Sequence, residues 1–485
     1  MSIYYIHPTA GNDSNIGSEV NPWLTLQTAV NRLNAGDTLI LKDGIYYSTD
    51  ENHINYQKIV GSASYITIKA QNKGYAIMDG QTVSKYAVQF YPGSCYLKFE
   101  GITIRNYYWA GFFSNNGTTG NFVHHIIISD CKIYDIGRRW EHESIGINAV
   151  FIGGGDHHWI ITRCLVYNIG RTQFTEDRMN KDHFVYTHTY TAGDPNVAHD
   201  NEYSYNIIYN TSGNMFNLCS NNDKILNNVS AWAFPNSISQ GIWLTAHEDS
   251  HGGNGLTIAN NIIYQVNDWD QKFAIIKTQY GGTAWVVKNN IVCSPMSLWY
   301  PGYEHPEWMA GNNYGIGCEN AVIDPMFVYA VKADMYNSDF RLKAGSPAIN
   351  AGVSVGLTAD FLKSAIVGNP DIGAYEYNGS NGGTVTYYSA EKSQAFVKND
   401  CGTGYYGSSV LYTVPFAKYT STVDQQTADA LALAEIAADG QDYANTNGTC
   451  LVTAIGGKTS INEYFTLMAD GSIWKMICGA FEKIV

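Results

Sequence analysis

The 485-residue chain lacks the features by which nucleic-acid-binding, zinc-binding and membrane-spanning proteins are usually recognised. It has no basic run, and its net charge of -14 disfavours nucleic acid and acidic membrane surfaces as partners. No two of its nine cysteines form a CxxC pair, so we expect no structural zinc site. No apolar run approaches the roughly 18 residues of a transmembrane helix. The N-terminus also has neither the basic nor the apolar region of a signal peptide, so no secretion signal is visible.

The chain is instead rich in apolar and aromatic residues. Apolar residues make up 45% and charged residues only 15%, which is the composition of a folded protein. The length allows a large core and two domains. Its 36 tyrosines and 11 tryptophans can fill a core or, where exposed, stack on the flat faces of a ligand.

A short motif of two polar residues followed by apolar ones recurs along the first 300 residues. Its copies end at Ile104, Tyr134, Tyr167, Tyr209, Ala231, Tyr264 and Cys293, in steps of 30, 33, 42, 22, 33 and 29 residues. Uneven steps of this size, with strand-like runs and no helical segments, are typical of the coils of a β-solenoid. Cys131, Cys164 and Cys293 fall in these apolar runs, and we expect them in the core.

A second strand-like run accompanies the later copies and predicts an exposed face. Alternate side chains of a strand face opposite sides, and stacked coils align them in columns. With Ile147, Val185 and Met215 facing inward, one outward column is Asn148, Tyr186, Phe216, Trp243 and Ile275. The next is Val150, His188, Leu218, Thr245 and Lys277, and a third is Ile152, Tyr190, Ser220, His247 and Gln279. A register slip of one residue would reverse these assignments.

The two ends of the repeat array and the last hundred residues differ from the coils. An apolar stripe of Leu26, Ala29, Val30 and Leu33 predicts a short helix that caps the first coil. The segment 378–385 is a Gly- and Asn-rich linker by composition. We therefore expect a solenoid domain over 1–377 and a small α+β accessory domain over 386–485. In the accessory domain we expect a helix from a capping box at Thr422 to Asp439, stopped by Gly440, and a hairpin over 464–476. Cys401 and Cys450 lie in polar loops of this domain, and a disulfide between them is one possible arrangement.

The segment YYIHPTAGNDSNIGSEVNPWLTLQTAVNRLNAGDTLILKDGIYY resembles the opening of right-handed parallel β-helix carbohydrate-active enzymes. The tail GSPAINAG…NPDIGAYEY is similar to their closing segment. This resemblance covers about residues 1–377 and implies an all-β, right-handed parallel β-helix of the polysaccharide lyase type. It is specific for the fold and weak for the activity, because lyases, hydrolases and uncharacterised proteins share these segments. The C-terminal domain resembles a small domain of unassigned function found in Bacteroidota proteins.

Two reaction classes fit the predicted face. In β-elimination from a uronic acid, a base removes the C5 proton and a cation stabilises the charge that develops on the carboxylate. We expect Tyr186 or His188 to be the base, and Lys277, Arg178 or Lys181 to be the cation. His183, at the strand start, is either a further proton carrier or a buried corner residue. Glycoside hydrolysis would need two facing carboxyl groups, and the available ones, Glu141, Glu143, Glu248 and Asp249, all fall in loops.

Further candidates surround these catalytic residues. We expect Trp243, His247, Phe216, Tyr190, Arg138, Arg139, Arg178 and Lys181 to bind substrate, with Arg138 and Arg139 either clamping a carboxylate or lying in a solvated turn. We expect no transition-metal site, because His247 and His251 flank a loop rather than a helix. The cofactor question stays open, with Ca²⁺ held by Asp156, Asp177, Asp182, Asp194 or Asp200 as one option.

The function that we predict is cleavage of a uronic-acid-containing polysaccharide by β-elimination. The rival prediction is a phage tailspike or adhesin that binds a surface polysaccharide, or depolymerises it by hydrolysis. Both place the protein outside the cell, as a secreted enzyme or in a virion. A secreted enzyme would be a monomer and a tailspike a homotrimer. For the C-terminal domain we predict independent folding and a role in attachment rather than chemistry.

Overall fold

The computed structural model describes the chain in segments. They are residues 1–48, 52–56, 63–114, 120–138, 146–172, 181–188, 196–233, 244–246, 253–265, 274–277, 283–293, 297–299, 323–379, 387–389, 391–415, 418–421, 425–452, 455–458, 464–467, 472–477 and 480–483. The chain divides into two compact units, Met1–Tyr377 and Asn378–Val485. Whether residues 378–385 act as a flexible linker stays a prediction.

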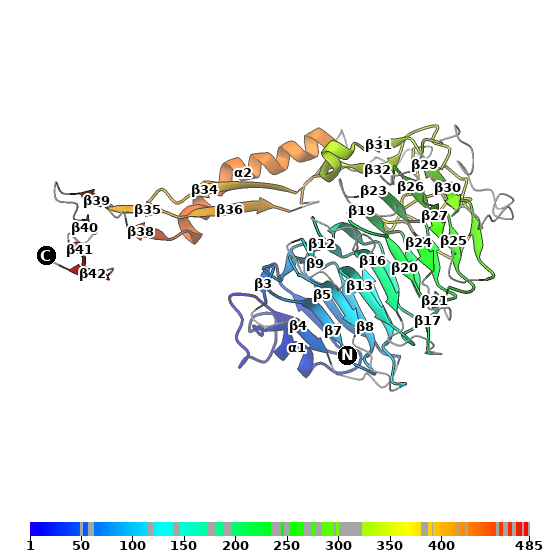
Figure 1. Cartoon of the computed structure of the whole chain (residues 1–485), viewed down its shortest axis with the longest axis horizontal. Coiled ribbons are helices and arrows are strands. Elements are labelled where there is room, and N and C mark those ends of the chain that lie inside the picture. The colour runs from blue at the N-terminus through cyan, green and yellow to red at the C-terminus, as the bar shows by residue number, and fades with distance from the viewer. Residues whose placement is uncertain are drawn as a thin grey trace. The chain divides into compact units, whose positions relative to one another are not determined.

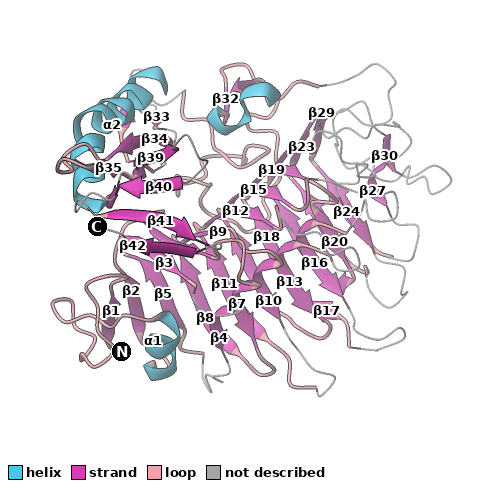
Figure 2. Ribbon diagram, turned by 60° about the vertical axis from the view of Figure 1, so that its left-hand side comes forward, coloured by secondary structure: helices cyan, strands magenta, loops and turns pink. Residues whose placement is uncertain are grey.

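The first unit is a right-handed parallel β-helix whose coils run through three parallel sheets (Figures 1 and 2). The first sheet has the order β1 (Ile3–Ile6), β2 (Thr38–Leu41), β5 (Ile66–Ala70), β8 (Cys95–Glu100), β11 (His124–Ser129), β14 (Ile160–Thr162), β18 (Glu202–Ser204), β22 (Lys224–Leu226), β25 (Thr257–Ala259) and β28 (Val286–Lys288).

The other two sheets follow the same stacking. The second sheet consists of β4 (Asn52–Tyr56), β7 (Tyr86–Phe90), β10 (Ala110–Ser114), β13 (Asn148–Gly153), β16 (His183–His188), β20 (Phe216–Leu218), β24 (Leu244–Ala246), β27 (Ala274–Lys277) and β30 (Ser297–Trp299). The third consists of β3 (Gly44–Tyr47), β6 (Ala76–Asp79), β9 (Thr103–Arg105), β12 (Lys132–Ile136), β15 (Leu165–Ile169), β19 (Ile207–Thr211), β23 (Val229–Ala233), β26 (Ile262–Tyr264) and β29 (Ile291–Cys293). Two short strands, β17 (Ala198–His199) and β21 (Ser220–Asn221), pair beside them.

The polar pairs of the sequence motif form the turn from the first sheet to the third. The first residue of six pairs is left-handed, with φ between 52° and 58°: Asp130, Arg163, Tyr205, Asn227, Asn260 and Asn289. Asn and Asp tolerate this conformation better than most residues do, which explains why they prevail here. The second residue of each pair is buried, namely Cys131, Cys164, Asn206, Asn228, Asn261 and Asn290. The repeat therefore encodes a sharp turn and then an inward-facing side chain.

The interior of the coils is one continuous apolar core. Ile, Leu, Val and Phe side chains from all three sheets form it, with the fully buried Trp159 among them. Cys131 and Cys164 lie in this core as predicted, and Cys293 is also buried. The five described cysteines outside the disulfide are all buried.

The predicted cap is present as helix α1 (Leu26–Arg32), which contributes Leu26, Ala29 and Val30 to the core. Its Gln27 side chain lies against β4, the edge strand of the second sheet. Gln27 Oε1 accepts a hydrogen bond from the Asn55 backbone N–H at 2.5 Å, and Nε2 donates one to the Asn55 carbonyl at 3.1 Å. These bonds satisfy open backbone groups that would otherwise template strand addition.

The segment 323–377 covers the outer side of the third sheet near the last coils. Strands β31 (Phe327–Tyr329) and β32 (Asp339–Leu342) pair antiparallel around the 3₁₀ helix η3 (Lys332–Asn337). Phe340 packs against Trp232, with ring centroids 5.6 Å apart, and Asn227 Nδ2 donates to the Asp371 carbonyl at 3.0 Å. Residues 370–377 contain no strand, and Asn227 Nδ2 donates to the carbonyls of both Asp371 and Gly373 in this stretch.

The second unit combines antiparallel strands with one long helix. Its elements are β33 (Tyr387–Tyr388), β34 (Lys392–Val397), β35 (Tyr405–Gly407), β36 (Ser409–Val414), β37 (Thr420–Ser421), α2 (Gln425–Asn447), β38 (Cys450–Val452), β39 (Ile455–Lys458), β40 (Tyr464–Leu467), β41 (Ile473–Ile477) and β42 (Ala480–Lys483). The antiparallel β40–β41 pair confirms the predicted hairpin. Thr422 of the expected capping box lies outside the described residues.

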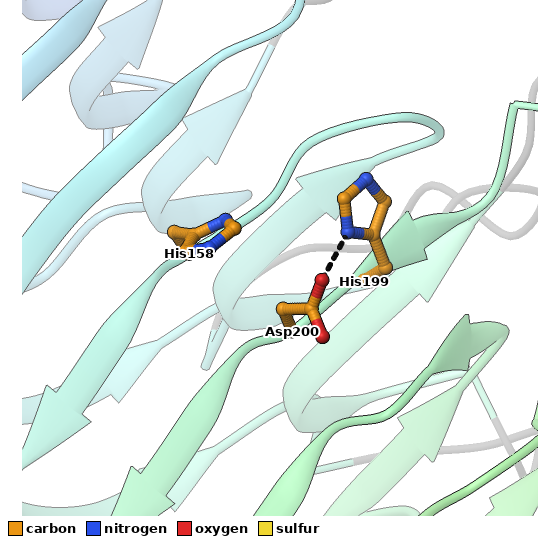
Figure 3. Close-up of side chains that lie close together, drawn as sticks. All are labelled: His158, His199 and Asp200. Atoms are coloured by element: carbon orange, nitrogen blue, oxygen red, sulfur yellow. Dashed lines mark hydrogen bonds and ion pairs between the residues drawn. The ribbon is translucent and has the colours of Figure 1, made fainter.

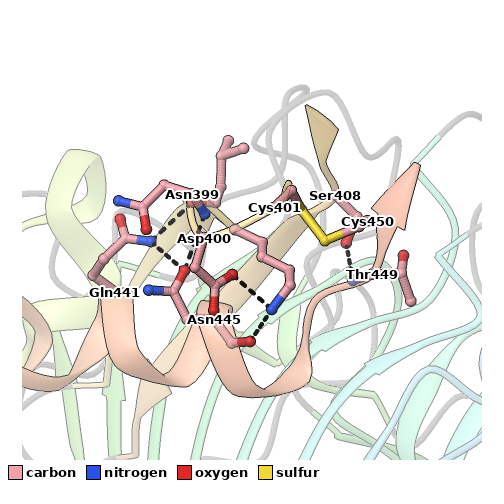
Figure 4. The surroundings of a disulfide bond; sticks show 10 residues. Asn399, Asp400, Cys401, Ser408, Gln441, Asn445, Thr449 and Cys450 are labelled. Atoms are coloured by element: carbon pink, nitrogen blue, oxygen red, sulfur yellow. Dashed lines mark hydrogen bonds and ion pairs between the residues drawn. A yellow bond between two sulfur atoms is a disulfide. The ribbon is translucent and has the colours of Figure 1, made fainter. Parts of the chain in front are cut away.

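Helix α2 runs past the predicted stop at Gly440, which was the wrong end point. A Cβ at Gly440 would lie 2.1 Å from the Phe396 ring on β34, so this glycine permits close packing of the helix on the strand. At the end of the helix, Cys401 and Cys450 form a disulfide (Figure 4). No helix among the described residues is long and apolar enough to span a bilayer.

Candidate active site

Three of the described candidate residues, His183, Tyr186 and His188, lie on strand β16 of the second sheet. Val185 of β16 lies opposite Val150 and Phe216 in the neighbouring strands, and all three are buried in the core. Tyr186 is on the outer face, opposite Phe151 of β13 and Asn217 of β20. The register continues from Asn217 to Thr245 of β24 and Lys277 of β27.

His183, Tyr186 and His188 form one cluster along this strand. The ring centroids of His183 and Tyr186 are 5.1 Å apart, and those of Tyr186 and His188 are 5.3 Å apart. Tyr186 and His188 are half-buried, so both are accessible from the outer face, whereas His183 is only 1% exposed. The cluster therefore has two reachable rings above one buried ring.

The hydrogen bonds of His183 fix its tautomer. Nδ1 donates to the Asn214 carbonyl at 3.0 Å, and Nε2 accepts from Asn217 Nδ2 at 3.3 Å. A neutral imidazole has one donor and one acceptor nitrogen, and this arrangement uses both. His183 is therefore placed to support the neighbouring rings.

Three amide oxygens close to His183 are buried and have no hydrogen-bond partner among the described residues. They are the Oδ1 atoms of Asn148, Asn214 and Asn217. Asn148 lies opposite His183 in the register, and the other two residues bond its ring. Buried acceptors of this kind are rare in folded proteins and call for a partner.

A buried ion pair anchors the start of β16. Arg171 Nη2 lies 2.6 Å from Asp182 Oδ1, and the same carboxylate accepts hydrogen bonds from the backbone N–H groups of Arg171 at 2.9 Å and Ile147 at 3.1 Å. Two glycines make room for it. A Cβ at Gly213 would lie 2.2 Å from the Asp182 carbonyl, and one at Gly170 would lie 2.1 Å from Ser212 Oγ. Sequence reasoning missed this pair, because Arg171 and Asp182 converge only through the coil geometry.

An aromatic stack continues the outer face toward the N-terminus. Tyr86 and Phe113 stack at 4.4 Å, Phe113 and Phe151 at 4.8 Å, and Phe151 meets Tyr186 edge-on at 5.6 Å. Tyr86 and Phe113 were not predicted, because their strands were not aligned with β16 from the sequence. Phe151 was missed because the predicted register, which is wrong, placed Asn148 opposite Tyr186. The stacked rings fix the ring of Tyr186 from one side.

The prediction that Phe216 lies on the outer face is wrong. Phe216 is fully buried and packs against Phe184 and Tyr203, with ring centroids 5.4 Å and 5.6 Å away. The alternation breaks because two successive residues of β16, Phe184 and Val185, both face the core. Relative to the predicted columns, β20 is shifted by one position and β24 and β27 by two, because Tyr186 is in register with Asn217, Thr245 and Lys277.

This shift moves Lys277 from the predicted column of His188 into the column of Tyr186. Three strand spacings separate Tyr186 from Lys277, which amounts to about 14 Å. Met215 is buried beside Phe216, in agreement with the inward prediction for that residue.

The remaining predicted residues are only partly described. Lys181 is exposed and directly precedes Asp182. Arg138 lies at the end of β12, where Nη1 donates to the Gly170 carbonyl at 3.4 Å. Burial lowers the pKa of Arg138, against the opposing effects of Asp135 and Tyr336. Outside the described residues lie Arg139, Arg178, Tyr190, Trp243 and His247.

The aspartates considered for calcium have other partners where they are described. Asp182 holds Arg171, and Asp156 accepts the backbone N–H groups of Val123 at 2.8 Å and Gly153 at 3.0 Å. Asp200 bonds His199 at 2.7 Å, while Asp177 and Asp194 lie outside the described residues. The three described aspartates therefore lie in separate places and do not together supply the oxygen ligands that calcium requires.

Comparison with known proteins finds likenesses to β-helix enzymes that act on polysaccharides. Pectate lyase L from Dickeya dadantii (strain 3937) is 30% identical over 134 residues, which are 25% of this chain and 31% of that protein. The chain thus spans less than a third of the length of this relative.

Two solved structures extend the likeness over more of the chain. Pectate lyase Pel9A is 16% identical with a TM-score of 0.37, covering 78% of this chain and 97% of that one. A structure titled "Glycoside hydrolase" is 8% identical with a TM-score of 0.42, covering 62% and 89%. In the second unit, residues 387–451 match a family described as "Family of unknown function (DUF5977)".

Proposed function

We propose that the first unit is a polysaccharide lyase that cleaves a uronic-acid-containing glycan by β-elimination on the outer face of the second sheet. The observation that carries this proposal is the make-up of that sheet. Its nine described strands contain no aspartate or glutamate, yet β16 alone carries His183, Tyr186 and His188. Hydrolysis needs two facing carboxyl groups, whereas elimination needs a base, a proton donor and a cation. The likeness to pectate lyase L supports the same class.

His188 and Tyr186 divide the proton transfers in this proposal. An ordinary imidazole is largely neutral at neutral pH, whereas a phenol keeps its proton. His188 therefore takes the C5 proton of the uronate. The electrons of that C–H bond form the C4–C5 double bond as the C4–O bond breaks, and the Tyr186 hydroxyl gives its proton to the departing glycosidic oxygen. The centroid distance of 5.3 Å between the two rings suits action at neighbouring atoms of one sugar.

The remaining residues orient the substrate. His183, held by Asn214 and Asn217, positions the Tyr186 ring, and Tyr186 in turn contacts His188. Lys181, exposed just before β16, and Arg178 stabilise the charge on the reacting carboxylate. Lys277, about 14 Å along the same column, meets the carboxylate of another sugar unit. We also propose that the substrate is contacted by the other residues predicted to bind it, namely Trp243, Tyr190, His247, Arg138 and Arg139.

The location and state of assembly belong to the same proposal. We propose an extracellular protein, in keeping with the disulfide between Cys401 and Cys450, since such bonds persist in oxidising compartments. A secreted lyase of this kind acts as a monomer, and a tailspike would be a trimer.

The test is incubation of the full chain with a panel of uronate polymers while the absorbance of the unsaturated product is recorded. We expect product from at least one polymer and a fall in turnover of about 100-fold or more in Tyr186→Phe and in His188→Ala. Matched controls are Tyr47→Phe, on the exposed surface of β3, and His7→Ala, near the N-terminus, which should keep normal turnover. Normal turnover in both site variants, or no product from any polymer, would refute the proposal. Retention on an immobilised glycan without cleavage would favour the adhesin instead.

A further inference from the structure

Five histidines and one aspartate lie where three successive coils enter the first sheet, at or just before the starts of β11, β14 and β18. Three successive coils present two of them each: His124-His125, His157-His158 and His199-Asp200. The first residues of these pairs are bridged in parallel, His124 to His157 and His157 to His199. Their rings stack face to face, with centroids 5.0 Å and 4.8 Å apart.

The second residue of each pair is left-handed, which brings neighbouring side chains to one side. The φ angles are 54° at His125, 58° at His158 and 57° at Asp200. In a regular strand, successive side chains would point to opposite faces. Here the two side chains of each pair meet. The Nδ1 atoms are 2.8 Å apart in His124-His125 and 2.7 Å apart in His157-His158, and His199 Nδ1 lies 2.7 Å from Asp200 Oδ2.

The second and third of these coils bring together three groups that can ligate one ion (Figure 3). One ligand atom each from His158, His199 and Asp200 lies within 4.8 Å of the others. His158 and Asp200 are exposed and His199 is half-buried, so an ion reaches them directly from solvent. Among the described residues this is the one group of three His, Cys, Asp or Glu side chains with such spacing.

We propose that His158, His199 and Asp200 bind a divalent transition-metal ion such as Zn²⁺. Ligand atoms on a tetrahedral zinc ion lie about 3.3 Å apart, given Zn–N distances of about 2.0–2.1 Å. Because His199 Nδ1 already lies 2.7 Å from Asp200 Oδ2, binding requires the exposed His158 side chain to approach these two ligands. The ion replaces the proton that His199 and Asp200 share, and solvent completes an open coordination shell.

The donor set decides the class of metal. Imidazole with one carboxylate suits zinc, copper and nickel, whereas calcium and magnesium prefer oxygen ligands alone. His157 bonds His158 through Nδ1 and stacks on His199, so it orients both ligands as a partner beyond the metal shell.

The site extends the sequence analysis, which expected no transition metal. The signal was present in the spacing of the pairs. His124 to His157 is 33 residues and His157 to His199 is 42, the same two steps that separate Tyr134, Tyr167 and Tyr209 in the repeat motif. Residues at equal positions of successive coils must stack, so these histidines belong to one column.

The test is titration of the untagged, chelator-treated full chain with Zn²⁺ by calorimetry, followed by Co²⁺ with the visible absorption of its tetrahedral complexes. We expect at least one ion per chain, a dissociation constant in the micromolar range or below, and no displacement by excess Ca²⁺. His199→Ala and the isosteric Asp200→Asn should each weaken binding at least tenfold, while His7→Ala leaves it unchanged.

Circular dichroism of each variant separates lost ligation from lost folding. If His199→Ala unfolds, Asp200→Asn and the wild-type titration still decide the matter. Absence of stoichiometric Zn²⁺ and Co²⁺ binding by the wild type would overturn the proposal, and so would unchanged affinity in a folded Asp200→Asn variant.

Discussion

Replacing Asn228 with alanine should destabilise the β-helix through a buried ladder of asparagines. Asn206, Asn228, Asn261 and Asn290 stack at the turn into the third sheet and are all buried. Oδ1 of Asn228 accepts the Asn206 backbone N–H at 2.8 Å and the Asn206 Nδ2 group at 3.0 Å. Its Nδ2 donates to the Tyr203 carbonyl at 2.9 Å and to Asn261 Oδ1 at 3.0 Å.

The size of the destabilisation depends on which polar groups keep a hydrogen-bond partner in the variant. In Asn228→Ala, Asn206 Nδ2 retains the Ile161 carbonyl, and Asn261 Oδ1 retains the backbone N–H of residue 228. The Asn206 backbone N–H loses the acceptor described above. An unsatisfied buried donor costs about 1–3 kcal/mol, and each lost hydrogen bond about 1 kcal/mol more. The variant also loses the three other hydrogen bonds of the Asn228 side chain, so we expect the free energy of unfolding to fall by about 4–6 kcal/mol.

Urea unfolding followed by far-ultraviolet circular dichroism measures this change. The control is Asn31→Ala, an exposed helix residue whose Oδ1 accepts only from Gln27 among the hydrogen bonds described here, and it should stay within about 0.5 kcal/mol of wild type. A change in Asn228→Ala no larger than in this control would refute the ladder as a source of stability.

Three further predictions concern pH, packing and the second unit. Burial, with repulsion from Asp371 and Asp360, raises the pKa of Glu376 from 4.5 to about 7. The folded chain therefore holds a proton that the unfolded chain releases, so this stabilisation is full below about pH 4.5 and is lost as the pH rises through about 7. Glu376→Gln should melt at a higher temperature than wild type at pH 8 and at nearly the same temperature at pH 4.5; an equal gain at both would contradict the buried carboxyl. Gly213→Val forces a side chain against the Asp182 carbonyl, so its melting temperature should fall by several degrees, while Gly402→Val, in open space and without a left-handed backbone, changes little. Ending the chain after residue 380 should leave a soluble β-helix with unchanged turnover, and aggregation of that fragment would show that the second unit is needed for folding.

The coils could be predicted from the sequence because two consecutive residues determine each turn. A polar pair such as Asn227-Asn228 needs one residue that tolerates a left-handed backbone and one that can be buried, and both requirements are visible in the letters. The cap was predictable for the same reason, since Leu26, Ala29 and Val30 form a local stripe.

The register of the strands, and the contacts between residues of different coils, were not predictable in the same way. Phe184 and Val185 both face the core, so strict alternation misplaced Phe216 and Lys277, although it placed Tyr186 on the outer face. The Arg171–Asp182 pair and the partners of His183 depend on which coils lie side by side. Gly440 read as a helix stop because its contact with Phe396 is invisible in the sequence.

The central claim is elimination rather than hydrolysis on the outer face of the second sheet. Mass spectrometry of the oligosaccharides that the full chain releases from a uronate polymer tests it most directly. Elimination gives a new non-reducing end that is lighter by one water than the hydrolysis product, because no water enters the bond. The account predicts this lighter product, and its loss in Tyr186→Phe and His188→Ala. Products that carry the added water, or the lighter product at an undiminished rate from both variants, would contradict it.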